Sequence, residues 1–288
     1  LESFPAPAHL PTLPGKEISS YPDNPLGPTF PKCRAEFFLP TIMCAPLFLI
    51  RILRSNSEIV MQQKLKEIKI KFRHAMNGIV SHNMRSQGAD YKINFGLTLP
   101  LLKRIAAETP ADAQLANALW ADTAVRESMM LAPLVYPIDE FTEAEANRWV
   151  ETMPNTEVAD ICCKFLFCRL PFARQKACEW SCSDRPLTQY TAFQLATAWL
   201  VAHPENTEAS NLGPVIDAAI AQATGQRDNR AFAAVNLLKQ AMHNDALAAH
   251  ILPLLQTKAK ADTAAQPLLD MLTEEQTLYR EFSGRDSR

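Results

Sequence analysis

The chain has 288 residues, of which 47% are apolar and 21% are charged, and only 8 are glycine. This length allows one large or two ordinary domains, and the shortage of glycine beside abundant Ala and Leu favours helices over sheets. A net charge of −2 excludes a whole-molecule field that attracts nucleic acid or a membrane surface. Any such function must therefore depend on a local patch.

Residues 1–60 differ in composition from the rest, because they hold ten of the 21 Pro. Such a segment is expected to lack regular structure. Its one apolar stretch is interrupted by Pro40 and Pro46, which makes it too short for a spanning helix and unlike a signal peptide. A strong helical pattern opens at Met61. We therefore expect the natural protein to start at or near Met61, with residues 1–60 a disordered or mis-assigned extension and residues 61–288 a helical repeat domain.

The segment from Met61 to Ala107 is basic, with nine Lys and Arg against two acidic residues. Its first apolar residues recur at roughly helical spacing: Leu65, Ile68, Phe72, Ile79 and Val80. Such a charged run is either the solvated face of a helix or a surface for an anionic ligand, and the sequence leaves both open.

A loop that leads into a helix is expected at residues 91–106. Gly96 suits a turn, the side chain of Thr98 suits an N-cap, and Pro100 fits the first helical turn. The Leu and Ile residues that follow would form the buried face of this helix.

From Ala113 to Glu281 the sequence predicts one amphipathic helix after another. The expected ranges are 113–120, 123–136, 142–153, 157–168, one around Trp180, 187–203, 212–224, 230–243, 246–256 and 264–281. Similar stop and start signals return at Pro110, Pro154 and Pro204, close to the roughly 40–47-residue period of HEAT and armadillo helix pairs. We therefore predict an all-α fold, an α-solenoid of HEAT-like repeats, with an irregular helical bundle as the alternative.

Seven Cys without a CxxC pair fit reduced thiols in a cytoplasm better than a disulfide framework. A zinc site from Cys168, Cys178 and Cys182 matches no usual spacing, so buried thiols are favoured. The six His show no paired ligand spacing, and the sequence has no GxSxG, GxGxxG or P-loop. We expect a cytoplasmic protein with no metal and no small-molecule cofactor.

Asp160 is the most informative single residue, because it lies in an otherwise apolar run from Val158 to Phe167. An acid at such a position is either a satisfied capping or ion-paired residue, or a carboxylate that orients water and stabilises developing positive charge. Both readings stay open at this point.

Four short motifs resemble the DNA alkylation repair family of HEAT-like DNA glycosylases. They are INFGLTLPLLKRIA at 93–106, LW-x5-RE-x3-LA at 119–132, VAD at 158–160 and EWS at 179–181. The similarity extends from about Met61 to His243. It implies a right-handed solenoid whose basic concave groove holds duplex DNA and excises positively charged alkylated purines.

The resemblance also implies roles for single residues. In that family an Asp between two Trp supports an oxocarbenium-like sugar and the attacking water, and Asp160 matches this catalytic acid. At the two aromatic positions this chain has Thr156 and Leu237. The Arg that follows the second aromatic residue is Gln240, and a phosphate-contacting Arg is replaced by Tyr190. These departures concern catalysis and leave the scaffold intact.

Phosphate contacts are expected from ten basic residues: Lys64, Lys69, Lys71, Arg73, Lys103, Arg104, Lys164, Arg169, Arg174 and Lys176. The first functional reading is a DNA alkylation repair protein, a monomer that binds double-stranded DNA and no membrane, with or without excision of alkylated purines. The second is a non-catalytic HEAT-repeat scaffold for a DNA structure or a protein partner.

Overall fold

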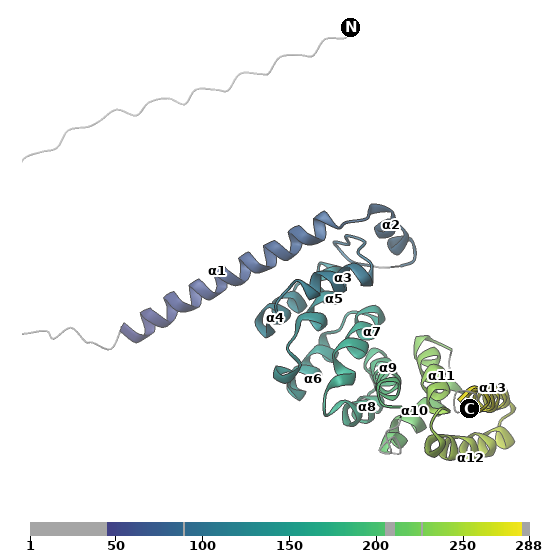
Figure 1. Cartoon of the computed structure of the whole chain (residues 1–288). Coiled ribbons are helices and arrows are strands. Elements are labelled where there is room, and N and C mark those ends of the chain that lie inside the picture. Colours follow the sequence, from purple (N-terminus) through teal and green to yellow (C-terminus); the bar gives the residue numbers. More distant parts are fainter. Residues whose placement is uncertain (1–44, 89, 205–210, 226, 284–288) are drawn as a thin grey trace, which may run out of the picture. The chain divides into compact units, whose positions relative to one another are not determined.

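The computed structural model describes residues 45–88, 90–204, 211–225 and 227–283 (Figure 1). The chain divides into two compact units, Leu1–Leu49 and Ile50–Arg288, and the helices from α2 onward belong to the second. Regular structure in the described ranges is helical, apart from an isolated parallel bridge between Ile93 and Val125. None of the described helices has the length and apolarity that crossing a bilayer requires. The predicted all-α class is confirmed, whereas most of the predicted 1–60 extension lies outside the described residues.

The first helix, α1, spans Ala45–His74, so the expected helix start at Met61 is wrong. Pro46 is compatible with this start, because it lies in the first turn, where its missing N–H would have had no helical partner. Ile68 and Phe72 form its buried stripe, as the spacing predicted.

The helical spacing that the sequence shows beyond His74 does not belong to one helix. The first helix ends at His74, and a second helix, α2, spans Gly78–Ser86. The side-chain oxygen of Asn77 accepts hydrogen bonds from the backbone N–H groups of Ile79 and Val80, at 3.1 and 3.2 Å, and so caps α2. The side chain of Ile79 is 76% exposed. Helical spacing alone did not reveal this break, which depends on a local side-chain cap.

The later helices lie close to the predicted ranges. They are α3 (Leu99–Ala107), α4 (Ala113–Ala121), α5 (Arg126–Val135), α6 (Glu143–Thr152), α7 (Thr156–Phe165), α8 (Ala173–Ser181), α9 (Pro186–Ala202), α10 (Gly213–Ala223), α11 (Asn229–Ala241), α12 (Asp245–Ala261) and α13 (Gln266–Ser283). Short 3₁₀ turns lie at Ile138–Glu140, Phe167–Arg169 and Thr263–Ala265. The main differences are that α7 ends at Phe165 and that α12 continues past Gln256.

Helix caps explain several of these boundaries. The Asn155 side chain accepts a hydrogen bond from the Val158 N–H at 3.1 Å, which confirms the predicted cap of α7. Thr98 occupies the N-cap position of α3, but its side chain makes no capping bond, so that part of the prediction is wrong. Pro100 supplies the start signal there instead, because its fixed φ suits a first helical turn.

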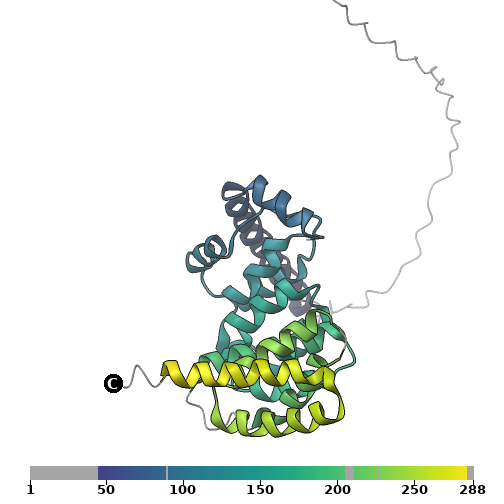
Figure 2. The same cartoon turned by 90° about the vertical axis from the view of Figure 1, so that its right-hand side faces the viewer.

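The helices from α3 to α13 pack as two layers. Helices α4, α8, α10 and α12 pack against α5, α9, α11 and α13, respectively, and Figure 2 shows the last pair side by side. Helices α3, α5, α7, α9, α11 and α13 also contact one another in succession, and they follow one side of the stack in Figure 1. We call these six helices the odd layer. Helix pairs stacked in this way are the arrangement of an α-solenoid.

Aromatic side chains fill the core between the layers. The Trp120 and Trp149 rings stack with centroids 4.1 Å apart, and Tyr136 and Phe141 meet Trp149 edge-on. Trp149 is fully buried and Trp199 nearly so. These rings are therefore part of the core and present no aromatic surface to a ligand.

Candidate nucleic-acid interface

Two adjacent charges of α5 anchor the loop before α3. Arg126 is 3% exposed and Glu127 is fully buried. The Glu127 carboxylate accepts hydrogen bonds from the N–H groups of Phe95 and Leu97 at 3.1 and 3.3 Å, and Arg126 Nη1 donates to the Leu97 carbonyl at 3.1 Å. A charge this deeply buried is tolerated because every polar atom around it has a partner.

The same network reaches the start of α7. The Arg126 guanidinium contacts both oxygens of Glu157, and Nε lies 3.0 Å from Oε2. The Tyr91 hydroxyl donates to Glu157 Oε2 at 3.2 Å and accepts from the Asn155 amide at 2.7 Å. Burial disfavours the charge on Arg126, but Glu157 and Glu127 hold its pKa above the usual value. Burial, with a contribution from Glu157, raises the pKa of Tyr91 to about 12.

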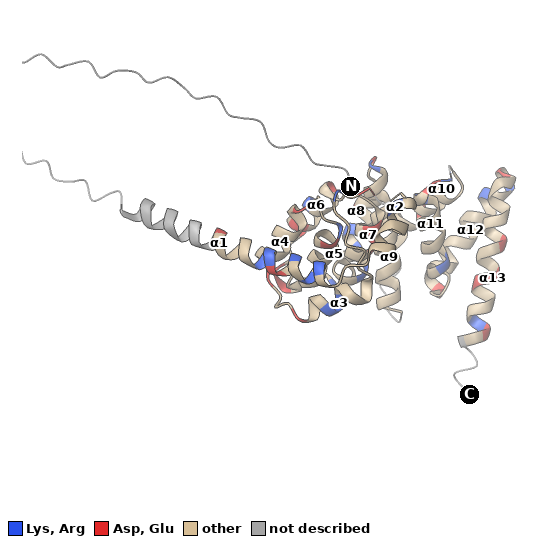
Figure 3. Cartoon of the chain, turned by 90° about the horizontal axis from the view of Figure 1, so that it is seen from above, with Lys and Arg blue, Asp and Glu red and all other residues tan. Residues whose placement is uncertain are grey.

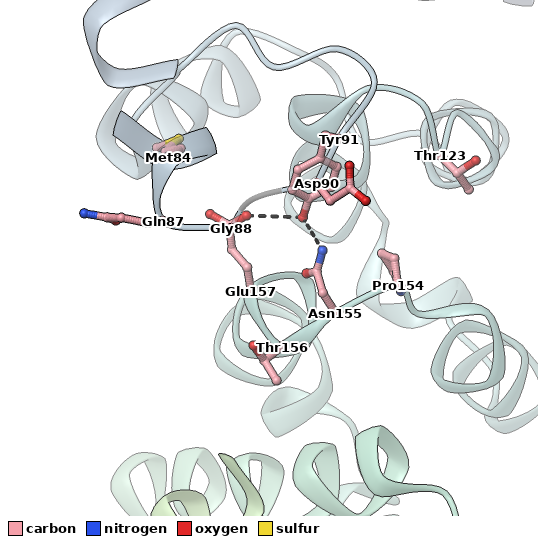
Figure 4. Close-up of a pocket in the computed structure, with 10 residues that line it drawn as sticks. All are labelled: Met84, Gln87, Gly88, Asp90, Tyr91, Thr123, Pro154, Asn155, Thr156 and Glu157. Atoms are coloured by element: carbon pink, nitrogen blue, oxygen red, sulfur yellow. Dashed lines mark hydrogen bonds between the residues drawn. The ribbon is translucent and has the colours of Figure 1, made fainter. Parts of the chain in front are cut away.

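A first cavity of about 560 Å³ opens beside this network (Figure 4). Tyr91, Asn155 and Glu157 lie on one side of it, and their two hydrogen bonds are visible in the close-up. Asp90 also lines the cavity, which therefore carries two carboxylates and no Lys or Arg. Such a lining repels a phosphate, so this cavity is a poor candidate for contact with a nucleic-acid backbone.

The two longest motifs behind the family resemblance belong to this structural network. Gly96 has φ of +73°, and a Cβ at that position would overlap the Asn77 carbonyl oxygen. Arg126 and Glu127 hold the same loop from the other side. Gly96, Arg126 and Glu127 therefore fix the loop against α5. This structural role does not depend on what the protein binds.

A second cavity, of about 400 Å³, lies between α7 and α9, and Asp160 lines it. Asp160 Oδ1 accepts hydrogen bonds from the Tyr190 hydroxyl and from the Gln194 amide, both at 2.8 Å. Gln194 also donates to the Tyr190 hydroxyl at 2.8 Å. Among the residues with described side chains, Oδ2 has no donor and no cation pairs with this acid. The sequence identified Asp160 but not its partners, although Tyr190 and Gln194 show the i, i+4 spacing of one helix face.

Burial sets the protonation behaviour of this acid. Burial raises the pKa of Asp160, and the hydrogen bonds from Tyr190 and Gln194 offset part of the rise. Burial, and then the charge of Asp160, raises the pKa of the Tyr190 hydroxyl, which therefore remains a donor. Tyr190, which stands where the resemblance places an Arg in the family, is thus a neutral hydrogen-bond donor to Asp160.

The walls of the second cavity are small or apolar. Cys163, Cys168, Thr197 and Val201 line it, and its lining contains no aromatic ring. Burial raises the pKa of both thiols, which makes them poor nucleophiles and metal ligands. Nor do the described His, Cys, Asp and Glu side chains form any group of three that suits a metal ion.

The two positions where the family has aromatic side chains do not restore such a wall. Thr156 lies at the start of α7 and lines the first cavity instead. Leu237 is fully buried in α11, within the hydrophobic core. The second cavity therefore offers a carboxylate without rings to stack on a sugar or a base.

Two of the expected phosphate-binding lysines contact the same aromatic ring, that of Phe165. Lys103 of α3 lies over the Phe165 ring, with Nζ 4.9 Å from the centroid, and Lys164 of α7 approaches the same ring at 5.8 Å. Lys164 also lines the second cavity. Both side chains are exposed, and neither has a carboxylate within ion-pair distance among the described side chains. Phe165, which the sequence did not single out, is thus within cation–π distance of two cations from different helices.

The other expected cations fall into three groups. Lys64, Lys69 and Lys71 of α1 pair with Asp112, Asp122 and Glu108, respectively. Arg174 lies over the Trp199 ring, with Cζ 5.7 Å from the centroid. Arg73, Arg104 and Arg169 are exposed. Figure 3 shows basic and acidic segments interleaved along α1 and its neighbours, as these pairs require.

Lys176 differs from the rest because its side chain is buried. Its Nζ lies 2.7 Å from Glu179 and 3.3 Å from Glu143. Burial alone would lower the pKa of Lys176, but these two carboxylates raise it. The ammonium group is therefore already paired within the protein and is not available to bind a phosphate.

No family model and no curated protein matches this chain. Among solved structures, one that is described as "A new family of proteins related to the HEAT-like repeat DNA glycosylases with affinity for branched DNA structures" aligns with a TM-score of 0.57 and 16% identity. The alignment covers 66% of this chain and 81% of the other. The predicted HEAT-like repeat fold, and the resemblance to relatives of the DNA glycosylases at the level of that fold, are thereby confirmed.

Proposed function

We propose that this chain binds DNA on the exposed face of the odd layer, with Lys103 and Lys164 as the central phosphate contacts. The observation that carries the proposal is the convergence of these two unpaired ammonium groups, from α3 and α7, on the Phe165 ring. Exposed cations that have no carboxylate partner among the described side chains are free to exchange their counterions for a phosphate. The solved structure of the same fold, whose description names affinity for branched DNA, supports DNA as the ligand.

Pairing within the protein explains why so few cations carry this function. Lys64, Lys69 and Lys71 already face carboxylates, and exchanging these partners for a phosphate gains little free energy. Arg104 follows Lys103 on α3, and Arg169 follows α7, so both are candidates for flanking contacts. The chain thus binds DNA with a local patch, although its net charge is −2.

The test is the salt dependence of binding. Replacing Lys103 and Lys164 with Ala should reduce the slope of log K against log salt by about 1 for each lost phosphate contact, whatever the DNA sequence. Fluorescence anisotropy with a labelled duplex and with a branched junction, each at two salt concentrations, measures this slope.

A double variant with Lys64→Ala and Lys69→Ala is the matched control, because it removes two lysines that are already paired. It should change the affinity less than twofold, a difference of about 0.4 kcal/mol. Equal losses in the two double variants would contradict the proposal. Weak, salt-insensitive binding by the unaltered chain would instead favour the scaffold for a protein partner.

Excision of alkylated purines by Asp160 is the second candidate. The supporting observation is that Asp160 lines a cavity of about 400 Å³ and that its Oδ2 atom has no donor among the described side chains. The lack of an aromatic wall counts against it, since nothing holds the damaged nucleotide in place. Incubation with methylated DNA tests this directly. Release of 3- or 7-methylpurine by the unaltered chain, lost in Asp160→Asn, would establish it, and no release from folded protein would exclude it.

A further inference from the structure

Helix α11 exposes an aromatic side chain that the fold does not use. Phe232 is 69% exposed, whereas the neighbouring Ala231 and Ala233 are buried. Asn236 and Lys239 follow at helical spacing, so the three side chains lie along one line of α11. Helix α10 packs on one side of α11, and α9 and α13 flank it. The exposed line therefore lies on the free face of the odd layer.

The contacts at the start of α9 and α11 place the first turns of the two helices side by side. Both helices begin at a third cavity, of about 260 Å³, which brings Pro186 and Tyr190 together with Asn229. Arg230 Nη1 donates to Gln189 Oε1 at 3.1 Å across the same boundary. Because the two helices start together and pack side by side, they run in the same direction. Phe232 follows Arg230 by two residues and therefore belongs to the turn of α11 that borders the first turn of α9.

The exposed Phe232 ring offers a flat apolar face, and a nucleic-acid base is a ligand that suits such a face. Stacking of a base on an aromatic side chain contributes binding free energy with little dependence on sequence. In an intact duplex the bases are already stacked on one another, whereas at a branch point unpaired or end bases present a free face. Lys239 lies about two turns further along the same line of α11 and is placed to contact the phosphate of the same strand.

We propose that Phe232 is a stacking platform for a base at a branch point, with Lys239 as its phosphate contact. This inference rests on the proposed DNA-binding function and adds its ligand class, a DNA structure with an unpaired or end-of-duplex base. The odd layer thus contributes two different elements: a cation pair that binds any backbone, and an aromatic side chain that selects for branching.

The test compares a branched junction with a linear duplex of the same strands. Phe232→Ala should weaken binding to the junction about tenfold and leave binding to the linear duplex within twofold, because only the junction offers a free base face. Phe232→Trp should retain the preference for the junction, since it keeps a stacking ring. Ile79→Ala, which removes an equally exposed apolar side chain from α2, is the control and should change neither affinity.

The outcomes separate this inference from the function on which it rests. If the unaltered chain binds neither DNA, both proposals fail. If it binds DNA and Phe232→Ala keeps the same ratio of junction to duplex affinity, the stacking platform is refuted while DNA binding stands. A loss in Phe232→Ala that Phe232→Trp does not restore would also refute it, because the ring face would then not be the feature recognised.

Discussion

Helix α7 carries two carboxylates, Glu157 and Asp160, in contrasting environments. Glu157 meets the guanidinium of Arg126 and the hydroxyl of Tyr91. Asp160, one turn later, meets only the neutral donors of Tyr190 and Gln194. The first acid pairs with a guanidinium that it shares with Glu127, whereas the second is hydrogen-bonded but pairs with no cation among the described side chains.

This difference separates the part of the molecule that holds the fold from the part that is open to a ligand. The Glu157 network joins α5, α7 and the loop before α3, and no buried polar side-chain atom among those described lacks a hydrogen bond. The Asp160 cluster leaves one carboxylate oxygen without a donor among the described side chains, and Asp160 lines the same cavity as Lys164. A carboxylate that is already paired with a cation gains little free energy from a ligand. A carboxylate without a cation can still interact with a bound group.

The largest predicted effect comes from breaking the compensated network. Arg126→Ala leaves the buried carboxylate of Glu127 without its cation and the Leu97 carbonyl without a donor, so we expect a loss of about 3–5 kcal/mol in the free energy of unfolding. Urea denaturation followed by circular dichroism measures this loss.

Arg148→Ala is the matched control, because it removes an Arg that pairs with Glu145 at the surface. An exposed pair of this kind contributes about 0–1 kcal/mol. Similar losses for the two variants would mean that burial does not distinguish the networks, and the contrast between the two acids of α7 would lose its basis.

The helix series could be predicted from the sequence because its signals are local. Pro100, the cap at Asn155 and the apolar spacing of each segment act within a few residues, and the predicted ranges follow them closely. The break after α1 is the exception, since Asn77 had no Pro beside it to mark a helix start. Local chemistry therefore predicts the elements and the solenoid that they form.

The partners of charged residues could not be predicted in the same way. Lys64 and Asp112 are 48 residues apart, and their pairing depends on how α1 packs against the start of α4. For the same reason the sequence treated Lys176 and Lys164 alike, although one is buried between carboxylates and the other is exposed. Asp160 was identified from its apolar neighbours, but its hydrogen bonds to Tyr190 and Gln194 depend on how α7 packs against α9 within the odd layer.

The smallest predicted effect concerns the pH dependence of the uncompensated acid. Burial raises the pKa of Asp160 in the folded state above its value in the unfolded chain, so the stability that the neutral acid contributes is complete below the unfolded pKa and is lost as pH rises through the folded pKa. Asn cannot ionise, and its carbonyl oxygen accepts the same bonds from Tyr190 and Gln194. The stability of Asp160→Asn relative to the unaltered chain should therefore increase with pH.

Urea titrations from pH 4 to pH 7.5 measure this change, with the exposed Asp139→Asn as the reference for loss of a surface carboxylate. We expect an increase of less than about 1 kcal/mol, because the cavity around Asp160 is open to solvent and screens the charge. A difference that falls as pH rises would mean that a cation near Asp160 stabilises its charged form. In that case Lys164 would be its partner rather than a phosphate contact, and the distinction between the two acids would disappear.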